Sequence, residues 1–175
     1  MTADMQPALS ASALKFIEHW KALSHTGLVP TLDEWLSELP VWIASHKFRA
    51  ELLPGDALVL FTGSANIARR GHNNTGASLF FGEESRLARG LENLSRLVLH
   101  PCGLWTENSY GAFPPKISRT QTVVMPLRMP AGRWPQVVGF TDELTTTSTE
   151  GIGIGGRLTT RWIDIGAGVP TAAPV

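Results

Sequence analysis

The sequence predicts a single α+β domain with a mostly antiparallel sheet. Apolar residues recur at helical spacing at the start of the chain and again over 83–99. Residues 47–62 and the part after residue 103 instead show strand-like runs separated by turn residues. The chain has 175 residues, 43% of them hydrophobic. It is therefore long enough to bury one core without disulfides or a structural metal.

The N-terminal part is expected to be helical over 11–40, after a flexible tail over 1–10. An apolar stripe at helical spacing predicts the first helix. The stripe contains Leu14, Phe16, Ile17, Trp20 and Leu23. Thr31 and Glu34 have the spacing of a capping box, in which each side chain bonds the backbone N–H of the other. A second short helix is therefore expected to start there and to stop near Pro40.

A hairpin is expected over 47–62. Pro54-Gly55-Asp56 separates two strand-like runs, and these three residue types together favour a tight turn. The polar stretch 63–82 is broken by glycines and is expected to hold only short helical turns. The segment 83–99 is the clearest helix, although Gly90 costs it about 1 kcal/mol relative to alanine. Its apolar face comprises Leu87, Leu91, Leu94 and Val98.

The rest of the chain is expected to form strands. The predicted strands are 103–110, 118–129, 136–141 and a short one over 161–165. Residues 145–156 are rich in threonine and glycine and predict a flexible loop. Residues 157–175 would then form a closing segment and a tail.

The string GIGIGG at 151–156 fits the glycine pattern of a dinucleotide-binding turn, but its surroundings do not. That turn needs a buried strand before it and a helix after it, within a βαβ unit. Here a Thr-rich run precedes Gly151, and the 19 residues after Gly156 include Pro170 and Pro174. We therefore interpret these glycines as part of the flexible loop.

Composition argues against several classes of partner. Lys plus Arg equals Asp plus Glu, at 15 each, so no overall charge favours nucleic acid or an anionic membrane surface. No apolar run approaches the roughly 20 residues of a membrane helix. The single cysteine, Cys102, cannot form an intramolecular disulfide, and no secretory signal is evident at the start. These features predict a cytoplasmic protein.

Few residues have the pattern of a functional site. His100 and Cys102 are ligand types for haem or a metal, and a cysteine near a histidine can act as a nucleophile. The other histidines show no ligand spacing, and we expect no metal site. Trp105, one of six tryptophans, is a third candidate for ligand contact, whereas ordinary core packing is the simpler expectation for all three. Phe16, Trp20 and Leu23 are candidates for a protein interface.

Four stretches follow one another in a recognisable order: FIEHWKALSHTGLVPTLDEW, ALVLFTGSANIARRGHNNTGASL, VVMPL and WIDIGAGVP. Together they resemble the small bacterial stand-alone PAS-type proteins. The matching positions are Trp20, Leu23, Pro30, Asp33, Gly63, Gly71, Thr75-Gly76 and Pro126-Leu127. The similarity spans roughly residues 13–143. Residues 11–144 would then be the PAS-like domain, with the loop over 145–156 as a departure from the pattern.

The resemblance implies a roughly five-stranded antiparallel sheet, with the N-terminal helices and a long connector helix over one face. It also implies a sensory or regulatory module without catalytic residues. We therefore expect a stand-alone module of bacterial signalling that binds a signalling protein or itself as a homodimer. No cofactor is expected. The alternatives are a sensor of a small ligand, haem or flavin, or an enzyme that uses Cys102.

Overall fold

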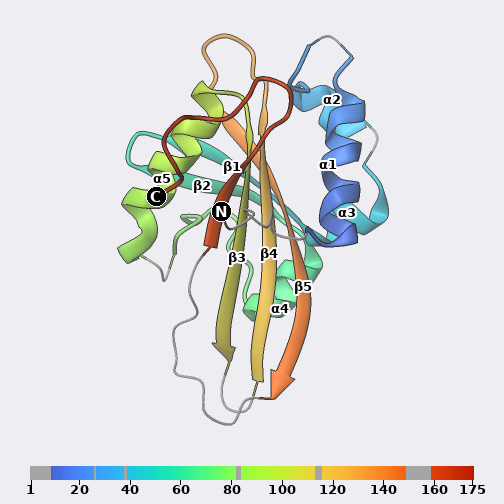
Figure 1. Ribbon diagram of the computed structural model, residues 1–175, viewed down its shortest axis with the longest axis vertical. Coiled ribbons are helices and arrows are strands. Elements are labelled where there is room, and N and C mark those ends of the chain that lie inside the picture. Colours follow the sequence, from blue (N-terminus) through green and yellow to red (C-terminus); the bar gives the residue numbers. More distant parts are fainter. Residues whose placement is uncertain (1–8, 26, 38, 82–83, 113–115, 149–158) are drawn as a thin grey trace, which may run out of the picture.

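The computed structural model describes residues 9–25, 27–37, 39–81, 84–112, 116–148 and 159–175. Its helices are α1 (Ala11–Leu23), α2 (Leu32–Ser37), α3 (Val41–His46), α4 (Ser64–Arg70) and α5 (Glu84–Leu99). Its strands are β1 (Lys47–Leu53), β2 (Asp56–Thr62), β3 (Gly103–Ala112), β4 (Lys116–Leu127), β5 (Gln136–Ser148) and β6 (Thr159–Ile163). The predicted α+β class with an antiparallel sheet is confirmed (Figure 1).

The sheet has six strands, in the order β2-β1-β5-β4-β3-β6. β1 and β2 form the predicted hairpin, and β3, β4 and β5 form a meander. Antiparallel pairing of β1 with β5 joins the two parts, with Phe48 opposite Gly139. The expected count of five is corrected to six, because β6 from the closing segment adds to the free edge of β3.

Helices cover both faces of the sheet, which corrects the expected placement over one face. Neighbouring residues of a strand point to opposite faces, so each strand serves two cores. On β4, Met125 belongs to a cluster with α1, whereas Val124 belongs to a cluster with α5. Figure 1 shows α1 on one side of the central strands and α5 on the other. The molecule therefore has three layers.

The α1 side holds the larger aromatic core. Phe16 and Trp20 are fully buried, and the Phe16 ring stacks on Phe140 with centroids 5.3 Å apart. Trp20 Nε1 donates a hydrogen bond to the Pro126 carbonyl oxygen at 3.1 Å. This bond satisfies a buried indole N–H and joins the first helix to β4.

The predicted capping box is confirmed at the start of α2. The Thr31 N–H donates to Glu34 Oε2 at 2.7 Å, and the Glu34 N–H donates to Thr31 Oγ1 at 3.2 Å. The bond from the Thr31 backbone is the main cause that lowers the pKa of Glu34. This local motif needs no tertiary contact to form.

Two glycines of the PAS-like pattern have clear structural reasons. A Cβ on Gly63 would lie 2.3 Å from the Ser45 carbonyl oxygen and 2.5 Å from that of Ala44. Only glycine therefore permits this close approach between the end of β2 and α3. Gly71 ends α4 with φ of 76°, the left-handed conformation typical of a glycine C-cap.

Two segments differ from the expectations. α3 was not predicted, because Val41, Trp42 and Ile43 favour a strand by residue type. β5 continues to Ser148, so the first residues of the expected 145–156 loop are strand. The GIGIGG string and most of the predicted tail over 1–10 lie outside the described residues. Within the part of the chain that is described, no helix has the length and apolar character to span a bilayer.

Candidate ligand cavity between α5 and the sheet

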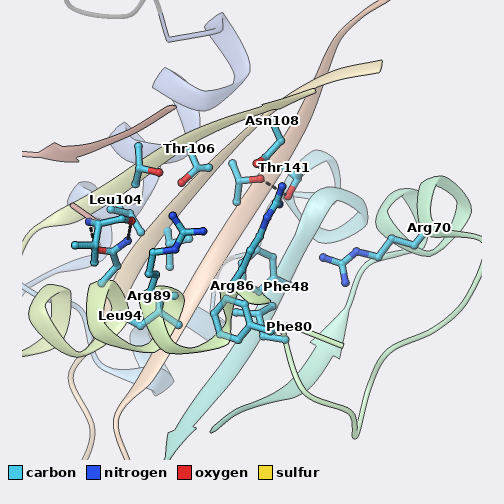
Figure 2. A pocket seen from close by; sticks show the side chains of 17 residues that line it. Phe48, Arg70, Phe80, Arg86, Arg89, Leu94, Leu104, Thr106, Asn108 and Thr141 are labelled. Carbon is cyan, nitrogen blue, oxygen red and sulfur yellow. Dashed lines mark hydrogen bonds between the residues drawn. The ribbon is translucent and has the colours of Figure 1, made fainter. Parts of the chain in front are cut away.

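A cavity of about 160 Å³ lies between α5 and the sheet. Figure 2 shows it from close by. Its sheet wall comprises Phe48, Leu104, Thr106, Asn108, Thr122, Val124, Thr141 and Thr160. Its helix wall comprises Arg86, Arg89, Gly90, Asn93 and Leu94, and Arg70, Leu79, Phe80 and Val175 complete the lining. One side of the cavity is thus a β-sheet and the other a single helix.

Strand register places four threonines in one row on the sheet wall. Thr106 on β3 pairs with Thr160 on β6 and with Thr122 on β4, and Thr122 pairs with Thr141 on β5. Directly paired residues share a face, so all four side chains point toward α5. Thr122 Oγ1 and Thr141 Oγ1 are 3.2 Å apart and share a hydrogen bond. The row gives the covered face of the sheet a band of hydroxyl groups.

The next row of the same face is apolar. It contains Trp162, Leu104, Val124, Gly139 and Phe48, in register across the five strands. A Cβ on Gly139 would lie 2.1 Å from the ring of Phe48, so the missing side chain makes room for that ring. The cavity wall therefore changes from apolar to polar over one step along the strands.

Beyond the threonine row, Asn108 presents an unsatisfied group. Its Oδ1 atom is buried and has no hydrogen-bond partner in the described part of the structure. A buried acceptor without a partner costs roughly 1–3 kcal/mol. A bound molecule with a donor group would satisfy this atom.

The helix wall supplies positive charge. Arg86 is half-buried, whereas Arg89 and Arg70 are exposed. Figure 2 shows Arg86 and Arg89 extending from α5 toward the sheet and Arg70 directed toward the cavity from the end of α4. Among the described lining residues there is no Asp or Glu.

Residues 172–175 connect the two walls. Asn93 on α5 exchanges two hydrogen bonds with the backbone of Val175, at 2.9 and 3.0 Å. Trp162 Nε1 on β6 donates to the Ala172 carbonyl oxygen at 2.8 Å. This segment therefore contacts both the helix and the sheet beside the cavity.

None of the three residues predicted for ligand contact lines this cavity. Cys102 is fully buried in the α5 cluster, and Trp105 is buried in the α1 cluster on the opposite face. His100 follows α5, and its Nε2 atom is buried without a partner among the described residues. These three side chains therefore lie in different places and do not form one site. In the described chain, no three His, Cys, Asp or Glu residues lie close enough together to hold a metal.

The residues predicted for a protein interface are interior. Phe16 and Trp20 have no exposed surface, and Leu23 is 5% exposed. Their stripe faces the chain's own sheet, which corrects the prediction that it is available to a partner. The spacing correctly identified an apolar helix face, but spacing does not reveal what covers that face.

Cys102 should behave as an inert core thiol. Burial, with a smaller contribution from the Asp164 carboxylate, raises the pKa of Cys102 to about 11. A nucleophilic cysteine requires a lowered pKa. We expect alkylation of the native protein by iodoacetamide at pH 8 to be far slower than that of the urea-unfolded chain. Equal rates would contradict this assignment.

The same shift predicts a pH dependence of stability. Above about pH 9, the ordinary pKa of a free thiol, the unfolded chain releases the proton while the folded protein retains it up to about pH 11. The unfolded state then binds fewer protons, so stability falls across this window. Burial lowers the pKa of Lys47 and acts in the opposite direction. Urea unfolding of the wild type and of Cys102→Ala at pH 8 and pH 10.5 isolates the contribution of the thiol. Between these two pH values the wild type should lose stability relative to the variant. An unchanged difference would contradict the raised pKa.

Gly90 permits the contact that closes one end of the cavity. A Cβ there would lie 2.1 Å from Phe80 Cε1. We expect Gly90→Ala to lower the free energy of unfolding by about 1 kcal/mol. Alanine gains about 1 kcal/mol over glycine in helix propensity, but the displacement of Phe80 should cost more than that. Ser95→Ala, at an exposed site of the same helix, is the control and should be neutral or slightly stabilising. A stabilised Gly90→Ala in thermal unfolding would show that Phe80 does not pack there.

Comparison of the chain with protein-family models finds no match, and comparison with curated proteins finds none either. The family resemblance therefore stays a proposal, and the α+β fold with its six-stranded sheet is what is established. The cavity residues were missed in the sequence because they come from five strands and two helices. The signal in the sequence was one threonine well inside each of three strands, at 106, 122 and 141, but only the register shows that these residues meet.

Proposed function

We propose that this chain is a PAS-like regulatory module that binds a small molecule between α5 and the sheet. The observation that carries the proposal is the row of four threonines facing α5 across the cavity. A sheet face covered by a helix is normally packed with apolar side chains, and buried polar groups need partners. A polar band, an open space and an unsatisfied Asn108 oxygen together favour a polar ligand.

The order of elements supports the PAS-like part of the proposal. A hairpin, a short helix, the long α5 and three antiparallel strands follow one another as in the family that the sequence resembles. The sixth strand and the N-terminal helices on the far face are additions to that arrangement. A module of this kind senses its ligand and does not transform it.

A ligand in this cavity would contact both walls and so alter their separation. Residues 172–175 are bonded to α5 through Asn93 and to β6 through Trp162. A change in the distance between the walls would therefore strain or release this segment. We propose it as the output of the sensor.

Filling the cavity tests the proposal. Thr106→Leu would place an apolar side chain in the cavity, whereas Thr159→Leu changes a neighbouring strand position that does not line it. We expect benzoate and benzamide, as probes of suitable size, to raise the melting temperature of the wild type and of Thr159→Leu in a concentration-dependent way. Thr106→Leu should lose this response. A response that is equal in the two variants, or absent from the wild type, contradicts the proposal.

Binding of a signalling protein or of a second copy is a second proposal, and exposed apolar residues on α2 and α3 favour it. Leu36 is 50% exposed, Val41 87% and Trp42 39%. These three exposed residues are not the ones that the sequence predicted for an interface, Phe16, Trp20 and Leu23, which are buried. Light scattering after size exclusion should show a dimer that is lost in Val41→Ser/Trp42→Ser. A monomeric wild type would overturn the homodimer.

A further inference from the structure

We infer that the cavity binds a small organic carboxylate, which Arg86 and Arg89 of α5 hold against the threonine row. This inference rests on the proposed function and names the class of ligand. It assigns the charge recognition to α5 and the shape recognition to Phe48, Leu104 and Val124. Each part follows from a separate observation.

The charge of the lining is one-sided. Three guanidinium groups line the cavity, and no described lining residue carries a carboxylate. Arg86 also interacts within the protein, and it is its positive charge and its place beside the cavity that attract an anion. Coulomb attraction is several-fold stronger beside a protein interior than in bulk water, so an anion gains most at this wall. A neutral ligand would leave that attraction unused.

The spacing of the arginines suits one planar anion. Arg86 and Arg89 are three residues apart on α5, so they lie on neighbouring positions of one helix face. Figure 2 shows both side chains extending toward the strands. Guanidinium groups bind carboxylates through paired, charge-assisted hydrogen bonds. Threonine hydroxyls on the opposite wall can donate to the same oxygens.

The volume of the cavity and the apolar row on its sheet wall determine the size and character of the uncharged part of the ligand. A cavity of about 160 Å³ is close to the roughly 150 Å³ that holds a benzene molecule. Phe48, Leu104 and Val124 provide a surface for an apolar body of that size. A nucleotide is much larger and more polar. A carboxylate with a short branched or aromatic body fits both walls.

Matched pairs of acids and amides test the inference on the full chain. Benzoate with benzamide, and phenylacetate with phenylacetamide, differ in charge but hardly in shape. We expect calorimetry at low salt to give at least tenfold tighter binding of each acid than of its amide. In Arg86→Gln/Arg89→Gln this preference should vanish, because the acid loses its charged partners and its affinity falls toward that of the amide. Arg133→Gln, an exposed arginine that does not line the cavity, should keep the preference.

The outcomes separate this inference from the proposed function. Equal binding of acids and amides by the wild type would overturn the carboxylate and leave the ligand cavity intact. Binding of neither would overturn both. Tighter binding of inorganic phosphate than of any acid would replace the carboxylate by a phosphate ligand and so overturn the inference. If the double variant does not fold, Arg89→Gln at its exposed site should still lower the acid preference, and an unchanged preference there would contradict the role of Arg89.

Discussion

Replacement of Trp20 by alanine is expected to lower the free energy of unfolding by about 3–5 kcal/mol. The indole is fully buried in the α1 cluster, and its Nε1 bonds the Pro126 carbonyl oxygen. The change leaves a large void and an unpaired carbonyl beside β4. A typical domain is stable by about 5–15 kcal/mol, so the variant should lose a large share of its stability.

Urea unfolding of three α1 variants measures this effect. Trp20→Phe keeps most of the ring volume but removes the hydrogen bond, and should lose clearly less stability than the alanine variant. Leu14→Ala is the control, because Leu14 is 47% exposed on the same helix. Its loss should stay below about 1 kcal/mol. If Trp20→Ala cost no more than Leu14→Ala, the indole would be at the surface and the interface first predicted for it would be restored.

Gly63→Ala is expected to cost about 3 kcal/mol, the upper end of the typical range for overpacking. The new methyl group would meet two backbone carbonyl oxygens, those of Ser45 and Ala44, at 2.3 and 2.5 Å. Backbone can yield only if α3 moves away from β2, and that would break the bond from the Gly63 N–H to the Lys47 carbonyl oxygen. If the new methyl group met the end of a flexible side chain instead of backbone, that side chain could rotate away at little cost.

Thermal unfolding of Gly63→Ala beside Gly27→Ala checks this. The nearest atom to a Cβ on Gly27 is the Nη1 atom of the Arg128 side chain, at 3.7 Å, so the methyl group fits. Gly27→Ala should be neutral or slightly stabilising, because alanine restricts the unfolded chain. Similar melting temperatures for the two variants would mean that the end of β2 is not held against α3.

The features that the sequence predicted are those with local causes. The capping box of Thr31 and Glu34, the turn at Gly55 and the periodicity of α5 all depend on residues close together in the chain. The features that it did not predict depend on long-range pairing. The strand predicted over 161–165 is present as β6, but its place at the free edge of β3 is set by pairing, and the helices divide between two faces because β4 and β5 present apolar residues on both.

The residues of the candidate site could not be predicted for the same reason, because long-range pairing brings them together. His100 and Cys102 were predicted from residue type and adjacency, and neither lines the cavity. The threonines at 106, 122 and 141 have unremarkable neighbours and meet only through strand register. Arg86 and Arg89 are not among the apolar residues that define the predicted stripe of α5. Only the fold shows that this side of the helix faces a cavity.

A nuclear magnetic resonance titration of the ¹⁵N-labelled full chain with benzoate tests the central claim most directly. Binding in the cavity should shift the backbone amides around Thr106, Thr122 and Thr141 and those of α5 near Gly90. Amides of α1, on the opposite face of the sheet, should stay unchanged. Shifts confined to α1–α3, or none at saturating benzoate, would contradict a ligand site between α5 and the sheet.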